Sequence, residues 1–338
     1  MALDPAIDRT GAGALIPEEV SREIIQGVPK NSAALGLMRK LPNMSRRQRR
    51  MPVLSVLPTA YFVDGDTGLK KTTNMAWRNK FINAEELAVI VPIPEAVIDD
   101  QDYDIWGEIR PQLLAAFGIA IDQAIFWGTN APGSWPENIL LGCWAAQHVE
   151  ALGTGTDIAD DIGGTNGIMA MVEADGYDVN GFVADVAVKA MLRGLRDGND
   201  ALLFQPSLQA GTPGTLYGES VQYIKTGMWV NTAAGVGDDP GSEGGAWVIG
   251  GDFQQAVYAM RKDITYTILR EAVIQDTDGS ILYNLAQQDM VALRAVMRLG
   301  WQLPNPINRM NENEYPGGGA AAGDYRYPFA SLTRPAAT

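Results

Sequence analysis

The chain has 338 residues, 46% of them hydrophobic and 20% charged, which predicts a globular protein of about two domains and excludes an intrinsically disordered one. Its net charge of −14 repels phosphate, so the molecule as a whole is not expected to be a general nucleic-acid binder. A single cysteine excludes an intrachain disulfide and a cysteine-ligated zinc cluster. With neither a signal peptide nor a membrane span in the sequence, we expect a soluble intracellular protein.

Residues 1–50 predict a polar arm with two short helices, one within 17–28 and one within 31–40. The arm ends in "SRRQRR", which contains Arg46, Arg47, Arg49 and Arg50. Such a cluster alone indicates a nucleic-acid or localisation patch. No aromatic residues interleave it, and it leads directly into a predicted strand. We therefore favour an intersubunit or positioning role, in which the arginines meet acidic groups of a neighbouring copy.

Residues 51–84 predict a long β-hairpin. "MPVLSVLPTAYFV" and "MAWRNKFINAEELAVIVPI" are rich in β-forming residues and flank the polar turn "DGDTGLKKTTN". The tip, 64–73, has almost no apolar residues of its own, and an isolated two-stranded ribbon is only marginally stable in water. A projecting hairpin therefore predicts a partner surface.

After the hairpin, "DYDIWGEIRPQLLAAFGIAIDQAIFWG" predicts a short helix, a break near Pro111 and a long helix over 111–127 that is apolar on nearly all sides. The following region, 131–260, is rich in glycine loops. Its expected elements are a helix over 156–177, a strand over 181–185, a helix over 186–198, a strand pair within 215–227, a strand over 246–252 and a helix over 253–263. Two strands within 264–274 and 289–303 follow, and the Gly/Ala/Pro-rich end predicts an extended tail.

No pattern predicts a catalytic or cofactor site. His148 lies five positions after Cys143, but nothing supplies the helper group or cleft that a Cys–His pair needs, so ordinary packing is the better interpretation. The stretch "GTGTDIADDIGG" lacks the third glycine and the preceding strand of a dinucleotide loop, and there is no Walker pattern.

Two acidic stretches of the sequence also fail to predict a functional site. "DTDGS" at 276–280 lacks the ligand spacing of a calcium loop, so no metal site is predicted. Asp99, Asp100, Asp102 and Asp104 could supply a carboxylate pair for glycoside hydrolysis, but sequence alone cannot place two of them across a cleft. A solvated or intersubunit charged face is favoured.

The order of these segments resembles the major capsid protein family of tailed bacteriophages, with the Hong Kong 97-type fold, an α+β class. The stretches that carry the resemblance are "VPIPEAVIDD", "IAIDQAIFWGTNAP", "TLYGESVQY", "VIGGDFQQAVYAMRKDITY" and "VALRAVMRLGWQLPNPI", within about 15–310. The resemblance implies an N-terminal arm (1–50), an extended hairpin (51–84), a peripheral domain (85–130 and 261–310), an axial domain (131–260) and a flexible C-terminal tail (311–338).

It further implies a non-enzymatic protein that self-assembles through pentamers and hexamers into an icosahedral shell around double-stranded DNA. The chain would assemble in the host bacterial cytoplasm and reside in the virion, without cofactors. The chain begins directly at the arm, so a separate scaffolding protein is expected; a portal and optionally a decoration protein are further partners. Some relatives cross-link through a lysine near the hairpin tip, but Lys70 and Lys71 lack a recognisable amide partner and catalytic acid, so cross-linking is not expected.

The residues expected at subunit contacts are Arg46, Arg47, Arg49, Arg50, Asp64, Asp66, Lys70, Lys71, Trp77, Asp99, Asp100 and Asp102. Two other functions remain open. One is the shell of an encapsulin-like cargo nanocompartment with the same fold. The other, of a different class, is a hydrolase that uses the acids of 99–104.

Overall fold

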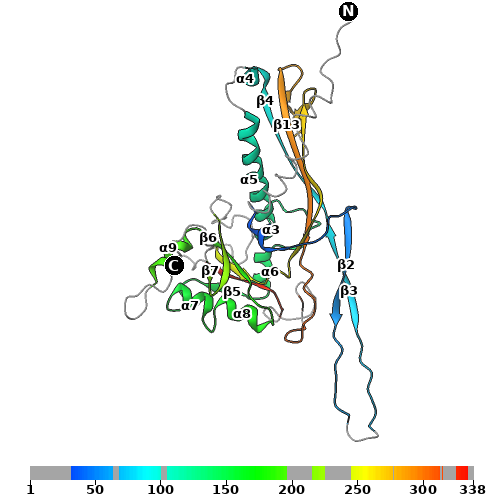
Figure 1. Ribbon diagram of the computed structural model, residues 1–338, viewed down its shortest axis with the longest axis vertical. Coiled ribbons are helices and arrows are strands. Elements are labelled where there is room, and N and C mark those ends of the chain that lie inside the picture. The colour runs from blue at the N-terminus through cyan, green and yellow to red at the C-terminus, as the bar shows by residue number, and fades with distance from the viewer. Residues whose placement is uncertain are drawn as a thin grey trace, which may run out of the picture.

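Two β-sheets, a long helix and a projecting β-hairpin make up the molecule (Figure 1). The computed structural model describes residues 32–63, 68–99, 105–195, 215–224, 245–276, 278–312, 314 and 325–333. Helices and strands both contribute, so the predicted α+β class is confirmed.

The first sheet is elongated and has four strands in the order β1-β10-β13-β4. These are β1 Arg39–Lys40, β10 Val257–Leu269, β13 Met290–Gln302 and β4 Glu85–Pro94. Strand β13 lies antiparallel to both β10 and β4, whereas β1 joins the edge of β10 in parallel. The strand predicted over 289–303 is confirmed.

Helix α5 (Ile105–Phe126) has 22 residues and runs along this sheet (Figure 1). Its buried Leu113, Phe117 and Ile121 share a hydrophobic core with residues of β13. The predicted break near Pro111 is wrong, because the helix continues through that residue. A proline inside a helix costs about 3 kcal/mol, but burial of each large apolar side chain contributes about 1.5–3 kcal/mol, so the packing outweighs the proline.

The helix predicted over 253–263 is also wrong. Residues 253–256 form a turn, and the chain then enters β10, where Val257 to Met260 are all buried. Strand β10 lies between two other strands of the sheet. A short apolar run that is buried on both faces has no periodicity that distinguishes a strand from a buried helix.

The second sheet has six strands in the order β5-β14-β9-β6-β8-β7. These are β5 Val149–Ala151, β14 Phe329–Thr333, β9 Ala246–Gly251, β6 Gly181–Asp185, β8 Glu219–Ile224 and β7 Thr215–Leu216. Four short helices lie near it: α6 Ile139–Ala145, α7 Ile158–Gly163, α8 Ile168–Ala174 and α9 Val188–Gly194 (Figure 1).

The elements around the second sheet agree with two predictions and contradict a third. The strand over 181–185 and the strand pair within 215–227 are confirmed. The single helix predicted over 156–177 is wrong, because α7 ends at Gly163 and α8 begins at Ile168. The glycines between them favour a turn over a continuous helix.

The prediction of a flexible tail over 311–338 is wrong for residues 329–333, which form β14. Strand β14 lies within the sheet, with β5 on one side and β9 on the other. Phe329, Ala330 and Leu332 have no exposed surface. The short run "FASLT" is preceded by glycine- and alanine-rich sequence, which concealed a strand whose stability comes from its two neighbours.

The extended hairpin pairs β2 (Gln48–Val56) with β3 (Ala76–Asn83) in antiparallel register. Beyond these strands the described arms, 57–63 and 68–75, project away from both sheets without a ladder (Figure 1). Three smaller elements complete the fold: a short hairpin of β11 (Val273–Gln275) and β12 (Ile281–Asn284), and the helices α3 (Ala33–Leu37) and α4 (Glu95–Asp99). Helix α3 confirms the helix predicted within 31–40; the one within 17–28 lies outside the described residues.

Candidate assembly surface

The extended hairpin exposes a large apolar surface. Phe62 and Leu69 flank the tip and are 104% and 91% exposed, and Trp77 on β3 is 61% exposed. Eight large apolar side chains of the hairpin are exposed in all: Val56, Tyr61, Phe62, Val63, Leu69, Met75, Trp77 and Phe81. Leu69 is the one large apolar residue of the tip, 64–73, and Phe62 lies just before the tip. A concentration of this kind marks a protein contact.

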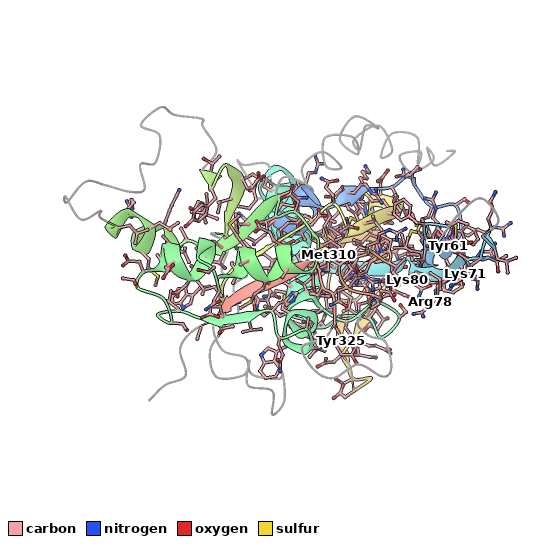
Figure 2. All side chains as sticks on the ribbon, turned by 90° about the horizontal axis from the view of Figure 1, so that it is seen from below. Tyr61, Lys71, Arg78, Lys80, Met310 and Tyr325 are labelled. Atoms are coloured by element: carbon pink, nitrogen blue, oxygen red, sulfur yellow. The ribbon has the colours of Figure 1, made fainter. Side chains whose placement is uncertain are left out.

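Tyr61 holds the two arms together where the ladder has ended. Its hydroxyl donates a hydrogen bond to the carbonyl oxygen of Lys71 (2.6 Å), and the Lys71 Nζ lies 5.9 Å from the centroid of the Tyr61 ring. Figure 2 shows both residues at the hairpin end of the molecule. One cross-strand contact thus keeps two arms, each otherwise without a partner strand, near one another.

The root of the hairpin is fastened by polar contacts. Arg47 donates to the Glu85 carboxylate at 2.9 Å, and the Ser134 hydroxyl donates to the same oxygen at 2.8 Å. These hydrogen bonds, Arg47 first, hold the pKa of Glu85 below its ordinary value. The Asn83 amide donates to the Ser134 carbonyl, and the Trp135 indole donates to the Asn83 carbonyl. The root is therefore fixed to the loop that follows α5.

The segment 302–312, which runs from the end of β13, forms a second support along the hairpin. The Lys80 amine donates to the Leu303 carbonyl (2.9 Å), and the Ile307 N–H donates to the Leu54 carbonyl (3.1 Å). Further out, the Arg309 guanidinium donates to the Pro58 carbonyl at 2.7 Å. Both strands of the hairpin are thus hydrogen-bonded to the body, on the first strand as far as Pro58.

Three cationic side chains surround the carboxylate of Glu314 next to β3. It forms an ion pair with Lys80 and lies 3.7 Å from both Arg78 and Arg326. Burial is the main cause that lowers the pKa of Lys80, and the hydrogen bond that Lys80 donates to the Glu314 carboxylate opposes it. Arg78 and Lys80 are labelled in Figure 2, next to the hairpin arms. Three cations around one carboxylate leave this side of the hairpin positively charged.

The arginines of "SRRQRR" do not form one structure. Arg47 is paired with Glu85, and Arg49 donates to the Pro42 carbonyl at 2.9 Å. Arg46 and Arg50 are exposed, and neither has an acidic partner within the described part of the chain. A polar hollow lies among them, lined by Asn43, Met44, Ser45, Arg46, Gln48, Arg49 and Arg50.

The other expected contact residues divide into two groups. Lys70, Lys71 and Trp77 lie exposed on the hairpin. Asp64, Asp66, Asp100 and Asp102 lie outside the described residues, as does the side chain of Asp99 at the end of α4. The carboxylate pair considered for hydrolysis therefore has no described geometry.

Sequence reasoning missed the part that Asp122 plays. This buried residue of α5 accepts hydrogen bonds from the Ser32 hydroxyl (2.5 Å) and from the backbone N–H groups of Ala33 (2.8 Å) and Ala34 (3.1 Å). It therefore fixes the start of α3, where the arm joins the body. A carboxylate in an apolar helix is costly unless it is paired, so its position in "GIAIDQAIF" was the available signal. Burial raises the pKa of Asp122 to about 6.

This shift predicts a pH effect. The pKa of Asp122 lies above its ordinary value of 3.8 in the folded state. Protonation of Asp122 therefore stabilises the folded state. This stabilisation is complete below the ordinary pKa of 3.8 and is lost as the pH rises through about 6. Relative to Asp122→Asn, the wild type should gain about 1 kcal/mol of unfolding free energy between pH 7 and pH 5. Urea denaturation at both pH values measures it. Asp278→Asn, in an exposed turn, is the control, and equal slopes for wild type and Asp122→Asn would contradict the assignment.

His148 and Cys143 form no catalytic arrangement. Their one direct hydrogen bond joins the His148 N–H to the Cys143 carbonyl, both backbone groups. The His148 ring instead contacts the Phe329 carbonyl (3.2 Å) and the Asp175 carboxylate (3.3 Å). Burial raises the pKa of the Cys143 thiol, which disfavours a nucleophilic thiolate. The pair belongs to the packing around β14.

Within the described ranges, no group of three or more histidine, cysteine, aspartate or glutamate side chains is placed to hold a metal ion. A search of the same residues finds no helix with the length and apolar character needed to cross a membrane.

Comparisons with known proteins agree with one another. The model of the phage capsid family matches residues 12–307. The major capsid protein of Staphylococcus phage 80alpha is 26% identical over 286 residues, which cover 83% of this chain and 79% of that protein. A solved chain from Microbacterium phage Oxtober96 is 34% identical, with a TM-score of 0.72 and coverage of 90% of this chain and 91% of that one. A chain from Mycobacterium phage Adephagia is 26% identical, with a TM-score of 0.71 and coverage of 91% of both.

Proposed function

The chain belongs to the phage capsid family, and from that premise we propose that its copies assemble as pentamers and hexamers whose extended hairpins each lie across a neighbouring copy. The protein is a structural subunit of a phage shell, as the resemblance in its sequence predicted. The nanocompartment and hydrolase alternatives are not favoured.

The observation that carries the proposed arrangement is the exposed apolar surface of the hairpin. Phe62 and Leu69 lie almost fully exposed, further out than the hydrogen bond from Arg309 of the body to Pro58. Large apolar groups on a monomer mark a contact that is covered in the assembly. A hairpin that projects from one subunit makes a head-to-tail contact, and such contacts generate closed rings when the rotation between subunits closes.

Domain roles follow from this arrangement as part of the proposal. The first sheet and α5 would form the peripheral domain (85–130 and 261–310), and the second sheet the axial domain (131–260), to which we add β14. The arm (1–50) would run under another subunit. The proposed partners are a scaffolding protein, a portal, optionally a decoration protein, and double-stranded DNA enclosed without sequence-specific contacts, with assembly in the host cytoplasm.

Negative-stain electron microscopy of the purified chain tests the proposal. Shells, or rings of five and six subunits, are expected. Particles no larger than one or two subunits at all protein concentrations, with a crowding polymer present, would count against self-assembly. Nuclease-resistant DNA in shells purified from infected cells would separate a genome shell from a cargo compartment.

We also expect mature shells to separate into single chains on a denaturing gel. An isopeptide cross-link needs an amide partner and an acid shielded from water, whereas Lys70 and Lys71 are both exposed. Boiled shells should therefore migrate as one band of 36.4 kDa. A ladder of multiples that disappears in Lys70→Arg/Lys71→Arg would show that the hairpin lysines do form covalent bonds.

A further inference from the structure

Charge is divided very unevenly between the hairpin together with the arginine cluster at its root (residues 44–84, called the hairpin segment below) and the rest of the chain. Residues 44–84 contain eight lysines and arginines but only two aspartates, a net charge of +6. The whole chain carries −14, so the remainder carries −20. We propose that the hairpin segment 44–84 is the cationic half of an electrostatic contact between copies, and that its partner is the acidic body of a second copy. This inference rests on the proposed function and adds what the hairpin recognises.

Among the residues that the structure describes, three of the eight cations of 44–84, Arg47, Arg78 and Lys80, have an acidic partner. In the described structure, the hairpin cations contact two acids, Glu85 at the root and Glu314 beneath β3. Arg46, Arg50 and Lys70 are exposed and make no ion pair with a described residue. A cation without an ion pair in the described structure can gain one on association without breaking a described pair.

The hollow at the hairpin root provides a place for such a partner. Three arginines line it, Arg46, Arg49 and Arg50, together with the amide-bearing Asn43 and Gln48. No carboxylate belongs to the lining. Guanidinium groups bind carboxylates in a bidentate manner, so the hollow suits an aspartate or glutamate side chain of the neighbouring body.

A second copy suits this surface better than DNA does. Two bodies of charge −20 repel each other, and a hairpin of charge +6 from each copy offsets that repulsion where they meet. DNA would have to approach the same acidic bodies. The hairpin also presents Phe62, Leu69 and Trp77, which match a protein surface and not a phosphate backbone.

The test uses the full chain with three double substitutions. Arg46→Gln/Arg50→Gln removes two charges from the hairpin, and Arg46→Lys/Arg50→Lys keeps them. Arg270→Gln/Arg294→Gln removes two charges from the body, so it has the same net charge as the first variant. Initial rates of assembly are measured by light scattering between 50 and 500 mM NaCl, and circular dichroism checks the fold of each variant.

Wild type, the lysine variant and the body variant should assemble fastest at low salt and slow by about tenfold or more at high salt, as expected for electrostatic steering. Arg46→Gln/Arg50→Gln should be about tenfold slower at low salt, with a flatter salt dependence. If that variant keeps the wild-type rate and salt dependence while shells still form, the inference fails and the proposed function stands. If wild type forms no shells or rings, the proposed function itself fails.

A DNA-binding measurement tests whether duplex DNA, and not a second copy, is the partner of the hairpin segment. Unassembled wild-type protein should bind duplex DNA only weakly at 150 mM salt, because its net charge of −14 opposes the approach. Salt-sensitive, sub-micromolar binding that is lost in Arg46→Gln/Arg50→Gln, while assembly of that variant is normal, would make the arginine cluster a DNA site and overturn the inference.

Discussion

Deletion of residues 64–73 is expected to abolish shell assembly and to leave the subunit folded. The deletion lies further out along the hairpin than Pro58, which accepts a hydrogen bond from Arg309 of the body. No residue between 64 and 73 belongs to a described core cluster. The monomer should therefore melt within a few degrees of wild type, because surface changes usually alter stability by no more than about 0.5 kcal/mol.

Assembly should respond far more strongly than folding. The deletion removes Leu69 and shortens both arms, which no longer reach a neighbour. A closed shell repeats each contact many times, so a small loss per subunit is multiplied over the assembly. Sedimentation velocity and electron microscopy measure the outcome, and circular dichroism with thermal melting provides the folding control.

Point substitutions refine this test. Phe62→Ser with Leu69→Ser keeps the length of the hairpin and should still reduce assembly strongly. Val186→Ser removes an exposed apolar side chain that follows β6 in the second sheet, and it serves as the matched control. If the deletion variant still forms full-sized shells, the hairpin tip is not needed for the contact between copies and the proposed role is wrong. An unfolded deletion would mean that the tip belongs to the core of the subunit.

Substitution of Arg326 by leucine is expected to destabilise the subunit by about 3 kcal/mol, within the range known for loss of one partner of a buried charge network. The Arg326 side chain is 2% exposed. Its guanidinium donates to the carbonyl oxygens of Glu312 (2.7 Å) and Asn305 (3.1 Å) and lies 3.7 Å from the Glu314 carboxylate. Leucine fills the space but leaves buried acceptors without a donor.

The position of Arg326 explains why the effect should be large. It precedes β14 and contacts the segment 302–312, which in turn supports the hairpin. Urea unfolding followed by tryptophan fluorescence measures the change, with Arg294→Leu as the exposed control on β13. The control should stay within about 0.5 kcal/mol of wild type. A loss below about 1 kcal/mol for Arg326→Leu would show that water replaces the guanidinium at little cost.

The features that sequence reasoning obtained correctly depend on local pattern. The hairpin strands, β6 and β13 have β-rich or apolar runs bounded by turn residues, and α5 is apolar on most of its sides. The order of these segments along the chain was enough to identify the family. The basic segment around Arg46 to Arg50 is also apparent in the sequence, because the chain as a whole is acidic.

The features that the sequence did not predict depend on contacts between segments that are far apart in the chain. Strand β14 has few strand-forming residues and exists because β5 and β9 hydrogen-bond to it from both sides. Pro111 stays in a helix because the sheet packs against α5, and Asp122 stays buried because Ser32, 90 positions away, meets it. Glu314 joins Lys80 to Arg326 only after three separate segments have folded together. Local preference is worth a few tenths of a kcal/mol to about 1 kcal/mol per residue, and burial or hydrogen bonding by a remote partner can exceed it. No sequence window contains that partner.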